Sequence, residues 1–151
     1  MGANLGDAEA QVRAAIAELG KWGPQRASSL WRTEPLGDPT QPWFVNAVVE
    51  LELGGDAPAC LERLLTLERA FGRPALRRRW APRCLDLDLL VFDDLVLSSE
   101  KLALPHPGLA SRRFVLAPLA ELAPDLVVPG QTRTIAALLR DLDDPLRVER
   151  L

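Results

Sequence analysis

CLDLDLLVF, residues 84–92, is the most strand-like segment of the chain, because apolar and acidic residues alternate along it. In a β-strand, residues i and i+2 point to the same face. Asp86 and Asp88 therefore leave this strand on one side, and the apolar residues leave it on the other: Leu85, Leu87, Leu89 and Val91. The pattern predicts a strand with one apolar face and one face that carries two carboxylates.

Two carboxylates on one strand face repel each other unless a cation lies between them. Hard oxygen ligands at the spacing of Asp86 and Asp88 suit Mg²⁺, above all where substrate phosphates complete the coordination shell. The same pair is compatible with an exposed strand face that binds no metal. The neighbouring sequence therefore has to decide between the two interpretations.

A basic loop precedes the acidic pair, with five arginines within eleven residues: Arg73, Arg77, Arg78, Arg79 and Arg83. Guanidinium groups match phosphate oxygens in shape and stay charged at any relevant pH. A basic run alone is typical of a solvated loop or an RNA-binding arm. Beside paired acids it favours phosphate chemistry. The sequence has no Gly-rich P-loop or protein-kinase motif, so such a site would be of another type.

Apolar periodicity and capping residues predict the remaining elements. The predicted helices are 7–19, Asp56 to Gly72, 112–122 and Thr134 to about Leu142; the predicted strands are 27–33, 44–53 and 95–98. The order helix–strand–strand–helix–strand resembles a ferredoxin-like βαββαβ core whose first strand is missing. We expect an α+β fold with helices packed on an antiparallel sheet, one domain over residues 1–151, and a chain that opens in a loop at Met1 and Gly2.

The composition of the 151 residues excludes several classes of protein. Hydrophobic residues make up 48% and charged residues 26%, which is typical of a globular chain. A net charge of −3 argues against a nucleic-acid partner. No apolar run approaches the roughly 20 residues of a membrane span, and no signal peptide opens the chain. The two cysteines, Cys60 and Cys84, suit a reducing compartment, so we expect a cytoplasmic protein.

Further side chains could meet a ligand. Phe44 and Asn46 share the face opposite an apolar stripe, and an aromatic ring with an amide can stack on and hydrogen-bond a flat heterocycle. Their spacing alone favours a structural role instead, with Phe44 as an aromatic residue at the edge of the sheet and Asn46 as an amide beside a turn.

His106, the only histidine, fits a phosphate donor or a structural role equally well. Arg112 would either contact a phosphate or lie in solvent. Phe114 would face either a ligand or the core. Trp80 would pack either on a bound base or against its own loop.

Several motifs in order resemble the 6-hydroxymethyl-7,8-dihydropterin pyrophosphokinase family of folate biosynthesis, and the resemblance covers nearly the whole chain. The motifs are Gly2-Ala3-Asn4-Leu5-Gly6; Thr33-Glu34-Pro35-Leu36-Gly37 with Gln41-Pro42 and Phe44-Val45-Asn46; RWAPRCLDLDLL over 79–90; and Pro105-His106-Pro107 with Arg112 and Phe114. The resemblance implies Mg²⁺-dependent transfer of pyrophosphate from ATP to the pterin hydroxymethyl group, with release of AMP.

The resemblance also implies a role for each matching residue. Asp86 and Asp88 would hold two Mg²⁺ ions. Arg73 and Arg83 would contact the phosphates and stabilise charge as the bond to AMP breaks. The residues implied for ATP are Glu68, Arg79, Trp80, Lys101, His106 and Arg112. Those implied for the pterin are Thr33, Leu36, Phe44, Asn46 and Phe114.

The chain departs from the family pattern at three places. Ala75 and Leu76 stand where the family loop is often basic, so Arg77 or Arg78 would replace a phosphate contact or that contact would be lost. Ala81 replaces a usual glycine.

The family also has a central strand before the first motif. Without it we expect low stability, or a true start upstream of Met1.

We expect a monomer that binds ATP and 6-hydroxymethyl-7,8-dihydropterin. Two alternatives remain: a truncated, inactive copy, and a non-catalytic ferredoxin-like module whose arginine loop binds RNA.

Overall fold

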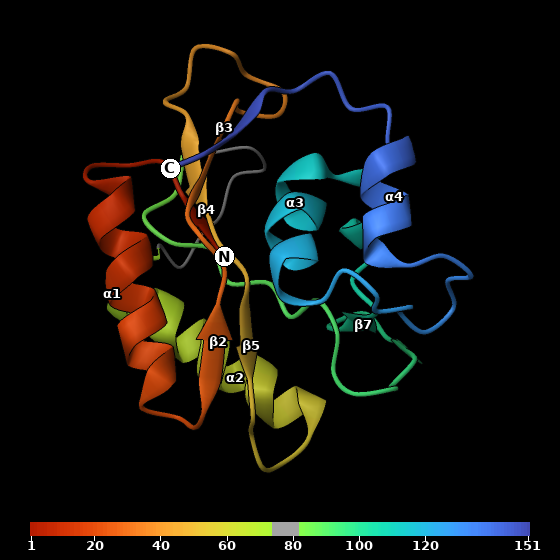
Figure 1. The fold of residues 1–151 in the computed structure, drawn as a ribbon. Coiled ribbons are helices and arrows are strands. Elements are labelled where there is room, and N and C mark those ends of the chain that lie inside the picture. The colour runs from red at the N-terminus through yellow and green to blue at the C-terminus, as the bar shows by residue number, and fades with distance from the viewer. Residues whose placement is uncertain (74–81) are drawn as a thin grey trace.

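The structure, a computed structural model, describes residues 1–73 and 82–151. Its central feature is a four-stranded antiparallel sheet in the order β1 (Gly2–Ala3), β4 (Phe44–Asn46), β3 (Trp31–Thr33), β8 (Val148–Arg150) (Figure 1). Two smaller antiparallel sheets pair β2 (Gln25–Ala27) with β5 (Val49–Leu51), and β6 (Leu97–Ser98) with β7 (Ala103–Leu104). Antiparallel sheets with packed helices agree with the predicted α+β class.

The helices lie on both sides of the strands, with α1 on one side and α3 and α4 on the other (Figure 1). They are α1 (Ala8–Gly20), α2 (Ala57–Ala70), α3 (Arg113–Leu122) and α4 (Ile135–Asp141), with a short 3₁₀ turn at Leu109–Ser111. All the predicted helices are therefore confirmed. The side chains of Asp7, Asp56 and Thr134 each accept an N–H in the first turn that follows, which explains where α1, α2 and α4 begin. Among the described residues, no helix is long and apolar enough to cross a membrane.

The predicted strands 27–33 and 44–53 are each split in two, into β2 and β3 and into β4 and β5. Ser28 causes the break. Its hydroxyl oxygen accepts the N–H of Val48 at 3.0 Å, a bond that a backbone carbonyl would make in a regular ladder. The N–H of Ser29 donates instead to the carboxylate of Glu121 at 2.6 Å. The N–H of Ser28 still donates to the carbonyl of Val48 at 2.9 Å, so side-chain partners replace only part of the ladder at the point where it divides into two sheets.

The prediction of a continuous strand over 84–92 is wrong, although the alternation that suggested it is present. Leu85 and Leu87 are 3% and 5% exposed, while Asp86 and Asp88 lie on the more open face. Only one bridge forms, between Asp86 and Gly2, with N···O distances of 2.8 and 2.9 Å. Gly2 is the one strand residue that pairs with this segment, and a single residue pair is too short to form a β-ladder.

The chain does not open in a loop, as the sequence suggested, because Gly2–Ala3 form β1. Met1 continues the pairing: its N–H and C=O both bond to Ala47, at 2.9 and 3.1 Å. Ala3 is fully buried against α1 and β4. The predicted strand 95–98 is shorter, at Leu97–Ser98, and forms a hairpin with β7. Strand β8 was not predicted.

A large, mostly apolar groove lies between β5 and segment 87–94, which ends in a turn at Asp93 and Asp94. Its volume is about 820 Å³, and its lining includes Met1, Leu51, Leu87, Leu89 and Phe92. Strand β5 pairs with β2 along one edge, and among the described residues no strand pairs with its other edge. The groove therefore runs beside the edge of β5 that faces away from β2.

Glu68 on α2 is a buried carboxylate, with 1% of its surface exposed. One oxygen accepts the N–H of Leu87 at 2.7 Å, and the other forms an ion pair with Arg73. Leu87 lies between the two aspartates, so Glu68 fixes the backbone that presents them. The same carboxylate anchors the residue at which the basic loop begins.

Replacing Glu68 by Ala should lower the free energy of unfolding by about 3 kcal/mol, because a buried N–H and a half-buried guanidinium lose their partner. Urea unfolding followed by circular dichroism measures the change. Glu62→Ala is the matched control, since Glu62 lies exposed on the same helix. Equal midpoints for the two variants would contradict this account of Glu68.

Candidate active site

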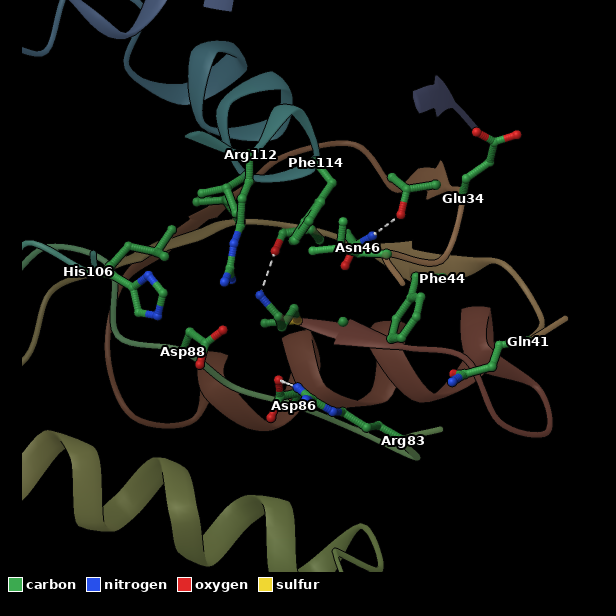
Figure 2. Close-up of a pocket in the computed structure, with 18 residues that line it drawn as sticks. Glu34, Gln41, Phe44, Asn46, Arg83, Asp86, Asp88, His106, Arg112 and Phe114 are labelled. Carbon is green, nitrogen blue, oxygen red and sulfur yellow. Dashed lines mark hydrogen bonds and ion pairs between the residues drawn. The ribbon is translucent and has the colours of Figure 1, made fainter. Parts of the chain in front are cut away.

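A cavity of about 340 Å³ lies against one face of β4, between α3, β1 and the segment that carries the aspartates (Figure 2). The sequence implicated ten of the residues that line it: Thr33, Leu36, Phe44, Asn46, Arg83, Asp86, Asp88, His106, Arg112 and Phe114. The other lining residues are Met1, Gly2, Glu34, Gln41, Ala47, Val48, Leu90 and Val115. Residues far apart in the sequence thus share one cavity.

The acidic pair forms part of the cavity wall, next to Arg83. Asp86 and Arg83 form an ion pair, and both side chains are largely shielded from solvent. Asp88 is more exposed than Asp86. Burial lowers the pKa of the Met1 amino group, while the negative charges of Asp88 and Asp86 oppose that shift. The carboxylates therefore make this wall attractive to cations.

His106 and Arg112 lie near Asp88 at one end of the cavity (Figure 2). The Nδ1 atom of His106 accepts the N–H of Gly108 at 3.0 Å, which leaves Nε2 to carry the proton of the neutral ring. A Cβ at Gly108 would lie 2.7 Å from Cζ of Arg112, so a larger residue at this turn would displace the guanidinium from its present position. This end presents donors suited to an anion.

An aromatic and amide surface forms the other part of the cavity. Phe44 projects from β4 and Phe114 from the start of α3 (Figure 2). The amide of Asn46 is buried and donates to Oγ1 of Thr33 at 2.8 Å, which fixes its orientation.

Gly2 faces Asn46 across the sheet. A Cβ at Gly2 would lie 2.3 Å from Oδ1 of Asn46, so this amide has its place only because residue 2 is glycine.

Asn4 connects the two loops that border the cavity, and only 2% of its surface is exposed. Its Nδ2 donates to Oε1 of Gln41 at 3.1 Å and to the carbonyl of Pro42 at 3.2 Å, and its Oδ1 accepts the N–H of Arg83 at 2.7 Å. Reasoning from the sequence assigned no role to this residue, although it lies in the motif over residues 2–6. Its burial and three bonds are visible only in the structure.

Several residues implied by the resemblance lie elsewhere. Glu68 is buried behind the aspartate segment and does not line the cavity, and Arg73 pairs with it. Lys101 lies in the exposed turn between β6 and β7. Arg79 and Trp80 fall outside the described residues, as do Ala75, Leu76, Arg77, Arg78 and Ala81.

The donor set fits a hard cation that brings some of its own ligands. Within residues 1–73 and 82–151, no group of three or more His, Cys, Asp or Glu side chains could enclose a metal ion. Asp86 and Asp88 offer carboxylate oxygens, which Mg²⁺ prefers, and Mg²⁺ commonly binds one or two carboxylates plus substrate phosphates. These residues therefore fit Mg²⁺ bound together with a polyphosphate.

The cavity thus combines two surfaces of different chemistry. Carboxylates, guanidinium groups and an imidazole form the first, which suits a metal-bound polyphosphate. Two aromatic rings and an oriented amide form the second, which suits a flat, polar heterocycle. A group bound at one surface would lie next to a group bound at the other.

Comparison with known proteins agrees with this chemistry. The family model described as 7,8-dihydro-6-hydroxymethylpterin-pyrophosphokinase matches residues 1–124. A 2-amino-4-hydroxy-6-hydroxymethyldihydropteridine pyrophosphokinase of Methylorubrum extorquens is 40% identical over 154 residues, which cover 100% of this chain and 95% of the relative. The protein of the same name from Haemophilus influenzae is 36% identical, over 95% of this chain and 91% of its own.

The family match includes every residue that lines the cavity, and the relatives align with nearly the whole chain. The chain belongs to the 7,8-dihydro-6-hydroxymethylpterin-pyrophosphokinase family.

Proposed function

We propose that this chain transfers the pyrophosphoryl group of ATP to the hydroxymethyl group of 6-hydroxymethyl-7,8-dihydropterin, a step of folate synthesis. The observation that carries the proposal is the single cavity that joins an acidic and basic surface to an aromatic and amide surface. The hydroxyl oxygen forms a bond to the β-phosphorus. The bond from that phosphorus to the oxygen shared with the α-phosphate breaks, AMP leaves with the electron pair, and the hydroxyl proton passes to water.

The pterin would occupy the aromatic surface. Phe44 and Phe114 would stack on its ring, and Leu36 would cover its exposed side. The amide of Asn46, oriented by Thr33, would hydrogen-bond its edge. These contacts would hold the hydroxymethyl group toward the phosphate surface, so that proximity supplies much of the rate.

ATP would occupy the charged surface. Arg83, Arg112 and His106 would donate to its phosphate oxygens and stabilise the negative charge that develops on AMP. Arg73, which pairs with Glu68 just before the basic loop, is also proposed to contact the phosphates. Arg79, Trp80 and Lys101 are proposed to border the nucleotide.

Asp86 and Asp88 would hold two Mg²⁺ ions together with the phosphates. Bound there, Mg²⁺ would neutralise phosphate charge and make the β-phosphorus easier to attack. Arg83, now paired with Asp86, would then be free to turn to the phosphates.

Asp86→Ala and Asp88→Ala should each lower pterin-dependent AMP formation at least about 100-fold, since both remove charge-stabilising contacts of the transferring group. Chromatography of the nucleotides separates AMP from ADP, and chelation by EDTA should stop the reaction. Asp94→Ala is the control, because Asp94 is an exposed acid further along the same segment.

Other results of this experiment would identify the chain as a nucleic-acid-binding module or as an inactive copy. A folded chain that makes no AMP and binds RNA equally well with Asp86→Ala would be the nucleic-acid module, and its binding would fall steeply with salt. A chain that neither folds cooperatively nor turns over would be the inactive copy.

We further propose that residues 1–151 form one ferredoxin-like domain that acts as a cytoplasmic monomer. The sheet order and the bridge from Gly2 to Asp86 support the topology. Both cysteines are unpaired thiols, which supports a reducing compartment. The groove between β5 and residues 87–94 starts at Met1, has a volume of about 820 Å³ and is lined mostly by apolar residues, which supports the proposal that one more strand would fill it.

We therefore extend the chain before Met1 by five residues in which apolar and polar residues alternate. This extended chain should melt at least about 5 °C above the unextended one, because the added strand would bury apolar surface in the groove. Differential scanning calorimetry measures the difference. An extension of equal length made of Gly and Ser is the control. Equal melting temperatures for the two extended chains would refute the proposal that a strand fills this groove.

A further inference from the structure

Loop 34–43 connects β3 to β4 and forms one wall of the cavity through Glu34, Leu36 and Gln41. Thr33 pairs with Phe44, so Glu34 and Trp43 are the residues at which the loop leaves the two strands. The side chains of both residues contact a single residue of the C-terminal segment. That residue is Arg147.

Arg147 lies beside Glu34 because β8 pairs with β3, with Val148 opposite Thr33. Its backbone N–H and its Nε donate to the two carboxylate oxygens of Glu34, at 3.0 and 2.8 Å. Its carbonyl accepts the N–H of Glu34 at 3.1 Å. Figure 2 shows Glu34 at the edge of the cavity with its carboxylate turned away from the centre.

The guanidinium of Arg147 also contacts the other end of the loop. Its Cζ lies 5.0 Å from the centroid of the Trp43 ring, and Cζ of Arg32 lies at the same distance. Both distances are typical of cation–π contacts. One side chain therefore bonds to the first residue of the loop and packs on the last.

The charge state favours this contact at neutral pH. The backbone N–H of Arg147, and then its guanidinium, lower the pKa of Glu34. Glu34 is thus ionised, and Arg147 stays cationic. An isolated exposed ion pair contributes little, but here the ion pair adds to a β-ladder and to a cation–π contact.

The family match ends at residue 124, so it does not include Arg147. Loop 34–43, by contrast, lies inside the matched region and borders the proposed pterin site. The segment that holds the loop therefore comes from a part of the chain that the family pattern does not describe.

We infer that Arg147 is a positioning residue for the pterin: by holding Glu34 and Trp43 at the two ends of loop 34–43, it sets where Leu36 and Gln41 stand in the cavity wall. The inference rests on the proposed function for the identity of the ligand. Arg147 itself does not line the cavity. Its effect reaches the substrate through the loop.

Arg147→Ala should raise KM for 6-hydroxymethyl-7,8-dihydropterin about five-fold, as expected from the loss of one exposed ion pair and one cation–π contact. KM for ATP should stay within about two-fold of its original value, because within residues 1–73 and 82–151 the side chain of Arg147 bonds to Glu34 and packs on Trp43, and neither residue belongs to the proposed ATP surface. Initial rates of AMP formation with each substrate varied in turn give the two constants.

Arg150→Ala is the matched control. Arg150 lies on the same segment and is equally exposed, at 64% against 67% for Arg147. It bonds to Ser29 and pairs with Glu121, and neither belongs to the loop. If the two variants shift KM for the pterin equally, or if Arg147→Ala shifts both constants together, the inference is overturned.

Amide hydrogen exchange tests the same inference without any activity. In Arg147→Ala the backbone amides between Glu34 and Trp43, which belong to Leu36, Gly37, Asp38, Thr40 and Gln41, should exchange several-fold faster than in Arg150→Ala, because the loop opens more often. Unchanged exchange in this loop would overturn the role of Arg147. Absence of AMP from the unmodified protein would refute the proposed function alone, since exchange is measured on the free protein.

Discussion

Gly2 exchanges two backbone hydrogen bonds with Asp86 on one side and faces Asn46 of β4 on the other. This one residue joins the acidic segment to the central sheet. In an antiparallel ladder the Gly2–Asn46 pair is of the closely spaced type without its own hydrogen bonds, because Met1 makes the bonds to Ala47. A side chain at position 2 would displace the amide of Asn46. The two surfaces of the cavity therefore meet across a single glycine.

The walls around this centre are held by side chains that are not exposed to the cavity themselves. Glu68 bonds to the backbone between the aspartates from behind. Asn4 ties the backbone of Arg83 to the loop that ends at Pro42. Arg147 holds the same loop from the opposite end of the chain. Each of these polar groups is satisfied by a partner on a different segment, so the loops are fixed relative to one another.

The sequence was a good guide to the parts that depend on local pattern. Helix periodicity with capping Asp56 and Thr134 predicted α2 and α4, and the alternation of Leu85, Asp86, Leu87 and Asp88 predicted which side chains face the core. Most residues taken from the motifs line the cavity.

Contacts between distant residues could not be predicted in this way. Ser28 interrupts two strands through a bond to Val48, twenty positions away, and no local pattern reports such a bond. Strand β8 is short and mostly exposed, so its hydrophobic pattern is weak. Its position is set by pairing with β3. The burial of Glu68 likewise follows from where α2 packs.

The groove beside β5 has a consequence for how copies of the chain meet in solution. An open strand edge with apolar surroundings is a template on which a second molecule can add a strand, which is a route to aggregation. Here the rim carries exposed acids, among them Glu52, Asp93 and Asp94, and the described lining contains no Lys or Arg. Two copies that approach edge to edge would bring like charges together. The acidic rim thus opposes edge-to-edge pairing of two copies at this groove.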